Sequence, residues 1–393
     1  MESITFHIGS RRLLSFALMG IMIGSILGGV LWSFGGVYFP KGLDLLTFKS
    51  EQELVDFLKM RIQDAPKSLI ERLSSAPQQL LTSIPSTTFS TNQMSAAESS
   101  GSRASTDYST TNIQVEGVDE ADIVKTDGEY LYIASGSTVY ILRAYPVEDA
   151  KVLSKISLSA TVFGLYVKDG KLVVFQSGYG SSTILRNITP YYSYYYVSTN
   201  TSITVFDVSN RSKPALERLV TVDGSYFSSR MIDDYVYAVI NKPAYVVNND
   251  TASLPVVCLD NNVTRVAASS IHYTGLQDYS YSFTIIVAMN IQDANQKPTI
   301  EPFLLGSTSQ IYVSRENIFL TSTIYTTQYQ YATIATTIHK ISVDAGSIIH
   351  VASGNISGYV LNQFSMDEYE GLFRVATSNG TSTSVYVLDG NLK

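Results

Sequence analysis

The sequence is poor in cysteine and in charge. Its 393 residues include one cysteine, Cys258, which excludes an intrachain disulfide and every metal site built from several cysteines. Charged residues make up 16% of the chain, below the roughly 25% usual for soluble domains. The net charge is −7, and because phosphate recognition needs a basic surface, this balance argues against DNA or RNA as a partner.

Histidine is scarce as well, and no catalytic motif is present. The four histidines, His7, His272, His339 and His350, are scattered and form no H-E-x-x-H or similar zinc pattern. His339 falls in a strand pattern that favours a structural histidine, and the apolar neighbours of Cys258 favour a small buried hydrophobic residue. No G-x-S-x-G turn, phosphate-binding loop or dinucleotide fingerprint occurs. The sequence therefore predicts no catalytic residue and no cofactor.

The N-terminus carries a long apolar segment. No charged residue occurs in residues 13–40, and about 20 apolar helical residues span a bilayer. A secretory signal has a shorter apolar core, so we prefer an uncleaved transmembrane anchor at 13–39 to a cleaved signal. Arg11 and Arg12 precede it, which places residues 1–12 in the cytoplasm and the rest of the chain outside. The predicted location is the cell membrane, with one span and an extracellular C-terminal domain.

Three glycines in this segment recur every fourth residue. Gly20, Gly24 and Gly28 would therefore share one helix face. Faces of small residues let two membrane helices approach closely, so one interpretation is a dimer formed through the anchor. The other is that glycine is simply common in membrane helices.

A helical stalk and a linker are expected to follow. Ser50 and Glu53 have the spacing of a capping box, and apolar residues at helical intervals predict a helix from Glu51 to about Asp64. We take residues 43–73 as the helical stalk. Residues 74–111 are rich in Ser, Thr, Ala and Gln, a composition that cannot offset the entropy of ordering. They are expected to form a flexible linker.

From residue 112 the pattern changes to short apolar strands separated by turns. Strand couplets with the same internal order recur five times and have no long amphipathic helix between them. The couplets fall at 130–142, 172–207, 235–287, 318–341 and 373–389. Their spacing is at or above the roughly 40–50 residues of a four-stranded propeller blade, and longer intervals would be loop insertions. The sequence predicts an all-β fold and favours a β-propeller over a β-sandwich.

Specific phrases in this region resemble a known family. The phrase TNIQVEGVDEADIVKTDG at 111–128 is the longest, and the others fall at 223–226, 229–232, 312–317 and 361–369. They resemble secreted or membrane-anchored β-propeller proteins of archaea and bacteria, distantly related to WD-40 repeats. The resemblance implies a propeller over 112–393 but no activity. Members of that family continue beyond the point matching residue 393, so about five blade units would be a truncated, incomplete ring.

The densest group of acids falls within the first phrase. Glu116, Asp119, Glu120 and Asp122 could offer several oxygens to Ca²⁺ outside the cell. Their spacing does not match an EF-hand loop, and acids at a solvated strand entrance are common. Calcium is therefore a minor hypothesis, and no other metal site is predicted.

Tyrosine is abundant, with 27 residues. Five of the six residues at 191–196 are tyrosine, and Tyr325, Tyr329 and Tyr331 form a second group in another insertion. Tyrosine suits glycan or protein contacts through its ring and hydroxyl. The competing interpretation is a low-charge loop held together by tyrosine packing.

Seven glycosylation sequons occur, all in the predicted outer domain. The sites are Asn187, Asn200, Asn210, Asn249, Asn262, Asn355 and Asn379.

These observations favour a membrane-anchored extracellular propeller that acts as a non-enzymatic binding module for glycans, envelope proteins or another subunit. The alternative is an extracellular propeller hydrolase or oxidoreductase whose catalytic residues lie in missing blades.

Overall fold

A computed structural model describes residues 45–63, 113–189, 192–247, 250–274, 281–306, 308–328 and 331–393, with side chains omitted at 61–63, 179–198 and 325–333. The predicted anchor at 13–39, its three glycines and the linker at 74–111 lie outside these residues and stay predictions. In the part that is described, no helix has both the length and the apolar character needed to cross a bilayer. The described residues all belong to one compact unit.

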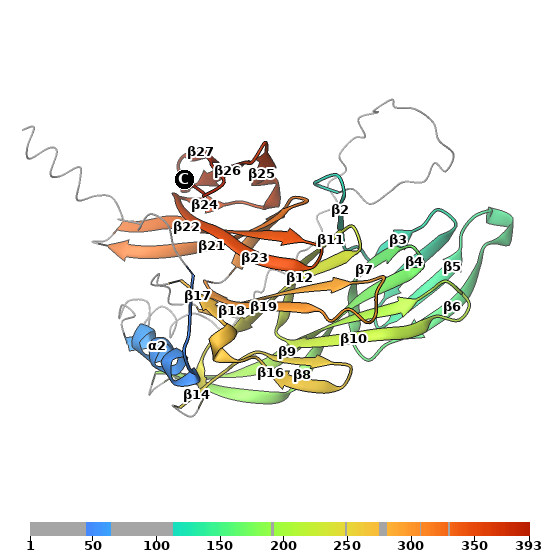
Figure 1. Cartoon of the computed structure of the whole chain (residues 1–393), viewed down its shortest axis with the longest axis horizontal. Coiled ribbons are helices and arrows are strands. Elements are labelled where there is room, and N and C mark those ends of the chain that lie inside the picture. The colour runs from blue at the N-terminus through green and yellow to red at the C-terminus, as the bar shows by residue number, and fades with distance from the viewer. Residues whose placement is uncertain are drawn as a thin grey trace, which may run out of the picture. The chain divides into compact units, whose positions relative to one another are not determined.

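The described chain forms five successive antiparallel sheets of at least four strands, here called blades 1 to 5 (Figure 1). Blade 1 contains β3 (Val124–Thr126), β4 (Tyr130–Ser135), β5 (Thr138–Arg143) and β6 (Lys151–Ser157). Blade 2 contains β7 (Thr161–Lys168), β8 (Lys171–Thr189), β9 (Tyr192–Asp207) and β10 (Ala215–Asp223). Blade 3 contains β11 (Ser225–Ile232), β12 (Tyr235–Pro243), β18 (Ser282–Asn290) and β19 (Thr299–Leu305).

Blade 4 contains β20 (Thr308–Val313), β21 (Asn317–Gln328), β22 (Tyr331–Asp344) and β23 (Ser347–Ser357). Blade 5 contains β24 (Tyr359–Val360), β25 (Met366–Tyr369), β26 (Leu372–Ser378) and β27 (Thr383–Leu388). β24 and β25 pair with the same edge of β26 and together form the first strand of this blade, so β26 is its second strand and β27 its third. Each of the five predicted couplets supplies two adjacent strands of one blade. The all-β prediction is therefore confirmed.

Additional short elements extend or join these blades. They are β1 (Leu46–Thr47), α2 (Glu51–Gln63), β2 (Val118–Glu120), β13 (Val246–Val247), β14 (Thr251–Ala252), β15 (Val256–Leu259), β16 (Asn262–Arg265), β17 (His272–Tyr273) and the single turns of 3-10 helix η1 (Val147–Asp149), η2 (Ala268–Ser270) and η3 (Gln363–Ser365). β2 and the pair β1–β17 extend blade 3, and β15–β16 extends blade 2.

Tight turns join the first strand of a blade to the second. At the turn of blade 2, Asp169 and Gly170 have φ values of 45° and 78°, and at the turn of blade 5, Glu370 and Gly371 have 51° and 76°. Two successive left-handed residues match the right-handed twist of a hairpin, and Asp and Gly tolerate that conformation. In the sequence, Asp-Gly pairs precede two of the five couplets, at 127–128 and 169–170, and the second pair forms such a turn.

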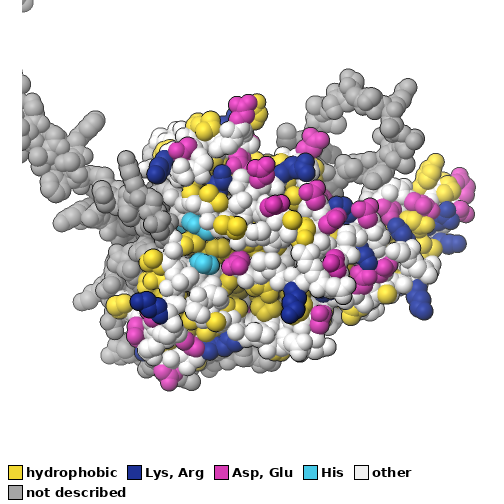
Figure 2. All heavy atoms as spheres, in the orientation of Figure 1, with side chains coloured by type: hydrophobic (Ala, Val, Ile, Leu, Met, Phe, Trp, Pro, Cys, Tyr) yellow, Lys and Arg dark blue, Asp and Glu magenta, His cyan; other side chains and the backbone are white. Residues whose placement is uncertain are grey.

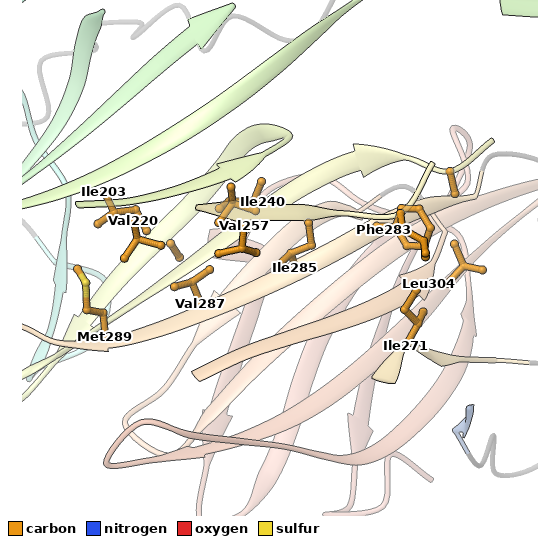
Figure 3. Close-up of a cluster of buried hydrophobic side chains, with 14 of the residues drawn as sticks. Ile203, Val220, Ile240, Val257, Ile271, Phe283, Ile285, Val287, Met289 and Leu304 are labelled. Atoms are coloured by element: carbon orange, nitrogen blue, oxygen red, sulfur yellow. The ribbon is translucent and has the colours of Figure 1, made fainter. Parts of the chain in front are cut away.

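The blades pack face to face in chain order. In β12, Val236, Ala238 and Ile240 face the cluster shared with blade 2, whereas Tyr237 and Val239 face the cluster shared with blade 4. Figure 3 shows the first of these clusters, where residues of β18 lie among residues of blade 2. Because the middle blades are buried on both faces, their strands are nearly continuous apolar runs.

The predicted stalk helix is part of the head. The Ser50 hydroxyl accepts the Glu53 amide at 3.2 Å, as a capping box requires, and α2 then packs against β13, β14 and η2. Phe48, 1% exposed, stacks on Tyr273 with ring centroids 4.0 Å apart. Glu51 binds the Arg265 guanidinium at 2.6 and 2.7 Å, and these bonds lower the pKa of Glu51. Segment 45–63 therefore belongs to the globular unit.

This packing predicts the effect of removing the Phe48 ring. Phe48→Ala should lower the free energy of unfolding by about 3–5 kcal/mol, because it removes a fully buried ring and leaves a cavity. Urea denaturation of the full chain measures the loss. Met60→Ala on the exposed side of α2 is the control, with an expected change within about 0.5 kcal/mol. Equal effects of the two substitutions would show that the helix does not depend on this contact.

Candidate binding surface

Residues 113–126, here called the strap, cross the blades in reverse chain order. The Gln114 side chain donates to two carbonyls near the start of blade 5, and Gly117 lies against Arg315 of blade 4. β2 pairs with β11 of blade 3, and the backbone of Asp122 bonds in both directions with Leu165 of blade 2. The strap then enters blade 1 as β3. The longest recognisable phrase of the sequence is therefore the segment that joins all five blades.

The four acids of the calcium hypothesis lie in the strap. Asp119 contacts the Lys125 ammonium at 2.7 Å, and Glu120 contacts Arg230 at 3.2 Å. The Asp122 carboxylate accepts the following backbone amide, and Glu116 is exposed. Across the described ranges, no three or more Asp, Glu, His or Cys residues gather to hold a metal ion. We therefore propose no calcium site.

Three neighbouring blades carry a large insertion at the same connection. The second and third strands are joined by an extended hairpin in blade 2, by residues 244–281 in blade 3 and by another extended hairpin in blade 4. In blades 1 and 5 the same connection is short. We call the two hairpins (β8–β9 and β21–β22) the arms, and the arms together with residues 244–281 the insertion side.

Hydrogen bonds place the bases of these insertions next to one another. Thr199, at the base of the first arm, bonds to Ser225 of blade 3 at 2.7 Å. Ser225 pairs across the sheet with Asn241, and Asn241 accepts from Thr284 at 3.2 Å. Thr284 bonds in turn to Thr308 of blade 4 at 3.0 Å, where the second arm begins. The three insertions therefore project from one side of the blades.

Both arms have a strand backbone, where the sequence predicted loops. Leu185 pairs with Tyr195 on the first arm, and Tyr325 pairs with Ile334 on the second. Segments rich in Tyr, Thr and Ile favour strands over loops, and that composition could have revealed the arms. The described members of the two tyrosine groups therefore lie on hairpin strands that extend beyond their blades; Tyr191 and Tyr329 lie outside the described residues.

Four of the seven sequons also fall on the insertion side. Asn187 is on the first arm, Asn200 at its base, and Asn249 and Asn262 within residues 244–281, although Asn249 is outside the described residues. Asn262, Asn210 and Asn379 are exposed. Asn355 is half-buried, and its amide oxygen accepts a hydrogen bond from the Thr337 hydroxyl at 2.7 Å.

A groove of about 600 Å³ lies between the outer parts of blades 3 and 4. One wall is the segment 348–353 of β23, and the other includes His272, Glu301 and Phe303. Burial raises the pKa of Glu301, and His272, 3.7 Å away, opposes that shift. Figure 2 shows histidine side chains at the surface of this face, beside acidic and apolar side chains. His272 and His350 therefore line one groove, which their spacing in the sequence did not predict.

A β-bulge arranges two of these histidines around a serine. His350 opposes Ile341 and Ala352 opposes Lys340, so Val351 is the extra residue. The bulge lets His350 and Ser353 point to the same face, and the Ser353 hydroxyl lies 2.8 Å from His350 Nε2 and 2.8 Å from His339 Nδ1. One hydroxyl proton can serve one imidazole, so the other ring must donate.

His339 makes stability depend on pH. Its complete burial, with a smaller effect of His350, lowers the pKa of His339 to about 3. The folded state therefore keeps this ring neutral in the pH range where the unfolded chain takes up a proton. The low pKa of His339 therefore leaves the free energy of unfolding unchanged above about pH 6.5. As the pH falls from 6.5 toward 3, the unfolded chain binds a proton that the folded protein does not, and the free energy of unfolding falls by up to about 1.4 kcal/mol per pH unit.

His339→Asn should remove this dependence, because asparagine does not titrate. We expect wild type to lose stability more steeply than the variant between pH 6.5 and 4, with parallel curves above pH 7. Urea denaturation at a series of pH values measures both slopes. Identical slopes below pH 6.5 would contradict a neutral buried imidazole.

Comparison with known proteins agrees with this architecture. The family model described as Beta propeller domain matches residues 108–393. An uncharacterised protein of Methanocaldococcus jannaschii is 25% identical over 380 residues, which covers 76% of this chain and 56% of the relative. An uncharacterised protein of Archaeoglobus fulgidus is 24% identical over 345 residues, with 73% and 55% covered. This chain thus spans little more than half the length of either relative.

The successive four-stranded blades define a propeller-type all-β protein. Because the family model covers most of the sequence, the chain belongs to the beta propeller domain family.

Proposed function

We propose that the protein is a cell-surface binding module, held in the membrane by residues 13–39 and exposing its propeller outside the cell. Its partner contacts are proposed to lie on the insertion side. The observation that carries this proposal is the placement of three insertions at the same connection of adjacent blades, with their bases joined by hydrogen bonds. Loops and hairpins that project from a rigid scaffold are where proteins commonly carry recognition.

The contacts of the strap favour a binding function over an enzymatic one. A propeller enzyme would need positioned acid and base groups that converge on one point. In the described strap, Asp119 and Glu120 are instead neutralised by Lys125 and Arg230. The arms provide tyrosine on a regular backbone, and a tyrosine side chain gives contact area at low conformational cost.

Shortening an arm tests the proposal. Residues 183–197 would be replaced by Asn-Gly, which closes a two-residue hairpin and keeps the arm base. Full-length protein in nanodiscs would be screened against glycans and envelope extracts, and each ligand found would be titrated on the variant. We expect affinity to fall about tenfold or more.

The control variant alters a connection at the end of a blade opposite to the insertions. Replacing η1 (Val147–Asp149), which joins the third and fourth strands of blade 1, by Gly-Ser-Gly should leave affinity unchanged. Equal affinity of wild type and the arm-shortened variant would contradict the insertion side as the contact surface.

Membrane topology is tested separately on intact cells. A C-terminal epitope tag should be digested by added protease, whereas an N-terminal tag should be protected until the cells are lysed. This outcome is expected from the basic residues before the apolar segment. Protection of the C-terminal tag would overturn the proposed location.

A further inference from the structure

The outermost strands of the blades differ in how their free edges are covered. The fourth strands of blades 1 to 4 are β6, β10, β19 and β23. β10 is covered by β15 in antiparallel pairing, and β19 is covered by β17 in parallel pairing. Within the described residues, no strand pairs with the outer edge of β6 or of β23. Among these four strands, the described part of the chain therefore covers the outer edges of two and leaves two open.

The two open edges have opposite chemistry. β6 carries Lys151 and Lys155, and lysine on an edge strand discourages pairing with another strand. β23 spans Ser347–Ser357 and contains no Lys, Arg, Asp or Glu. Its Ile349 and Val351 side chains are 60% and 46% exposed. A long, uncharged edge with exposed β-branched residues favours the addition of a strand, and the bulge at Val351 limits continuous pairing to the residues on either side of it.

The groove of about 600 Å³ runs along this edge, because its wall is the continuous segment 348–353. A strand added to β23 would alternate its side chains between two environments. One set would lie on the side of Ile349, and the other would face the groove wall with His272 and Glu301. Glu301 is a half-buried carboxylate, so a cation at one groove-facing position would complement it.

We propose that the outer edge of β23 is a strand-addition site for an extended segment of a partner protein, with apolar residues at alternate positions and a basic residue facing Glu301. A polypeptide is the occupant because the open edge presents backbone donors and acceptors that another backbone can pair. The site goes beyond the proposed function, since it involves neither the arms nor membrane anchorage.

The test uses a defined probe, the fluorescent peptide acetyl-Thr-Val-Lys-Val-Thr-Val-amide, titrated onto full-length protein in nanodiscs. Its valines lie on one face and its lysine on the other, as the two sides of β23 require. We expect saturable binding and slower hydrogen exchange of the amides in 348–353. The double variant Ile349→Lys, Val351→Lys copies the lysines of β6 and should raise Kd about tenfold or more.

A charge reversal tests the lysine contact. Replacing the peptide lysine by glutamate should weaken binding to wild type, and Glu301→Gln should remove most of the difference between the two peptides. Leu216→Lys, at an exposed apolar site on β10, is the matched control and should keep wild-type affinity. The arm-shortened variant should also bind the peptide normally, which separates this site from the first arm.

Three results would overturn the proposal. They are absence of saturable binding up to about 1 mM peptide, unchanged affinity in the double lysine variant, and exchange protection on a strand other than β23.

Discussion

Each middle blade must bury both of its faces, and the rest of the structure depends on that constraint. In blade 3, Val239 and Ile240 are adjacent and point to opposite faces, yet they are 1% and 0% exposed. A single sheet with two apolar faces cannot be stable in water, so blades 2 and 4 are as necessary to it as its own hydrogen bonds. The strap adds a second tie, because its polar contacts hold the edges of blades that are distant in sequence. Lys125 is 6% exposed and is compensated by Asp119 at 2.7 Å.

The low charge of the sequence follows from the same constraint. Strands buried on both faces leave few positions for ionised side chains, so charges collect at turns and edges. Asp127, in the first turn of blade 1, shows how such a charge is used. Its carboxylate accepts the Tyr132 hydroxyl at 3.0 Å and the Arg211 guanidinium at 3.1 Å, and thereby links blade 1 to the turn that follows β9 in blade 2. The low content of charged residues is therefore explained by strands that are buried on both faces, and it does not by itself indicate a function.

Sequence patterns predicted those parts of the fold that depend on neighbouring residues. The couplets were correct because period-two runs and Asp-Gly turns are local signals, and α2 begins at Glu51 as its capping residues predict. Where α2 packs was missed, because its partners Tyr273 and Arg265 are some two hundred residues away in sequence. The arrangement of His339, His350 and Ser353 was missed as well, since it depends on a bulge that shifts one strand by a residue. The spacing of residues in the sequence does not reveal such a shift.

The insertion of blade 3 covers the edges of two blades and also lies on the proposed contact surface. Residues 244–281 supply β15 and β17, which cover β10 and β19, and the same segment forms part of the insertion side. Covering an edge and binding a partner strand use the same backbone hydrogen bonds, and they differ in whether the added strand belongs to the same chain. Blade 4 carries a long arm but no such covering segment among the described residues, and its outer strand lacks protective lysine. A strand of a partner protein can cover an edge of that kind.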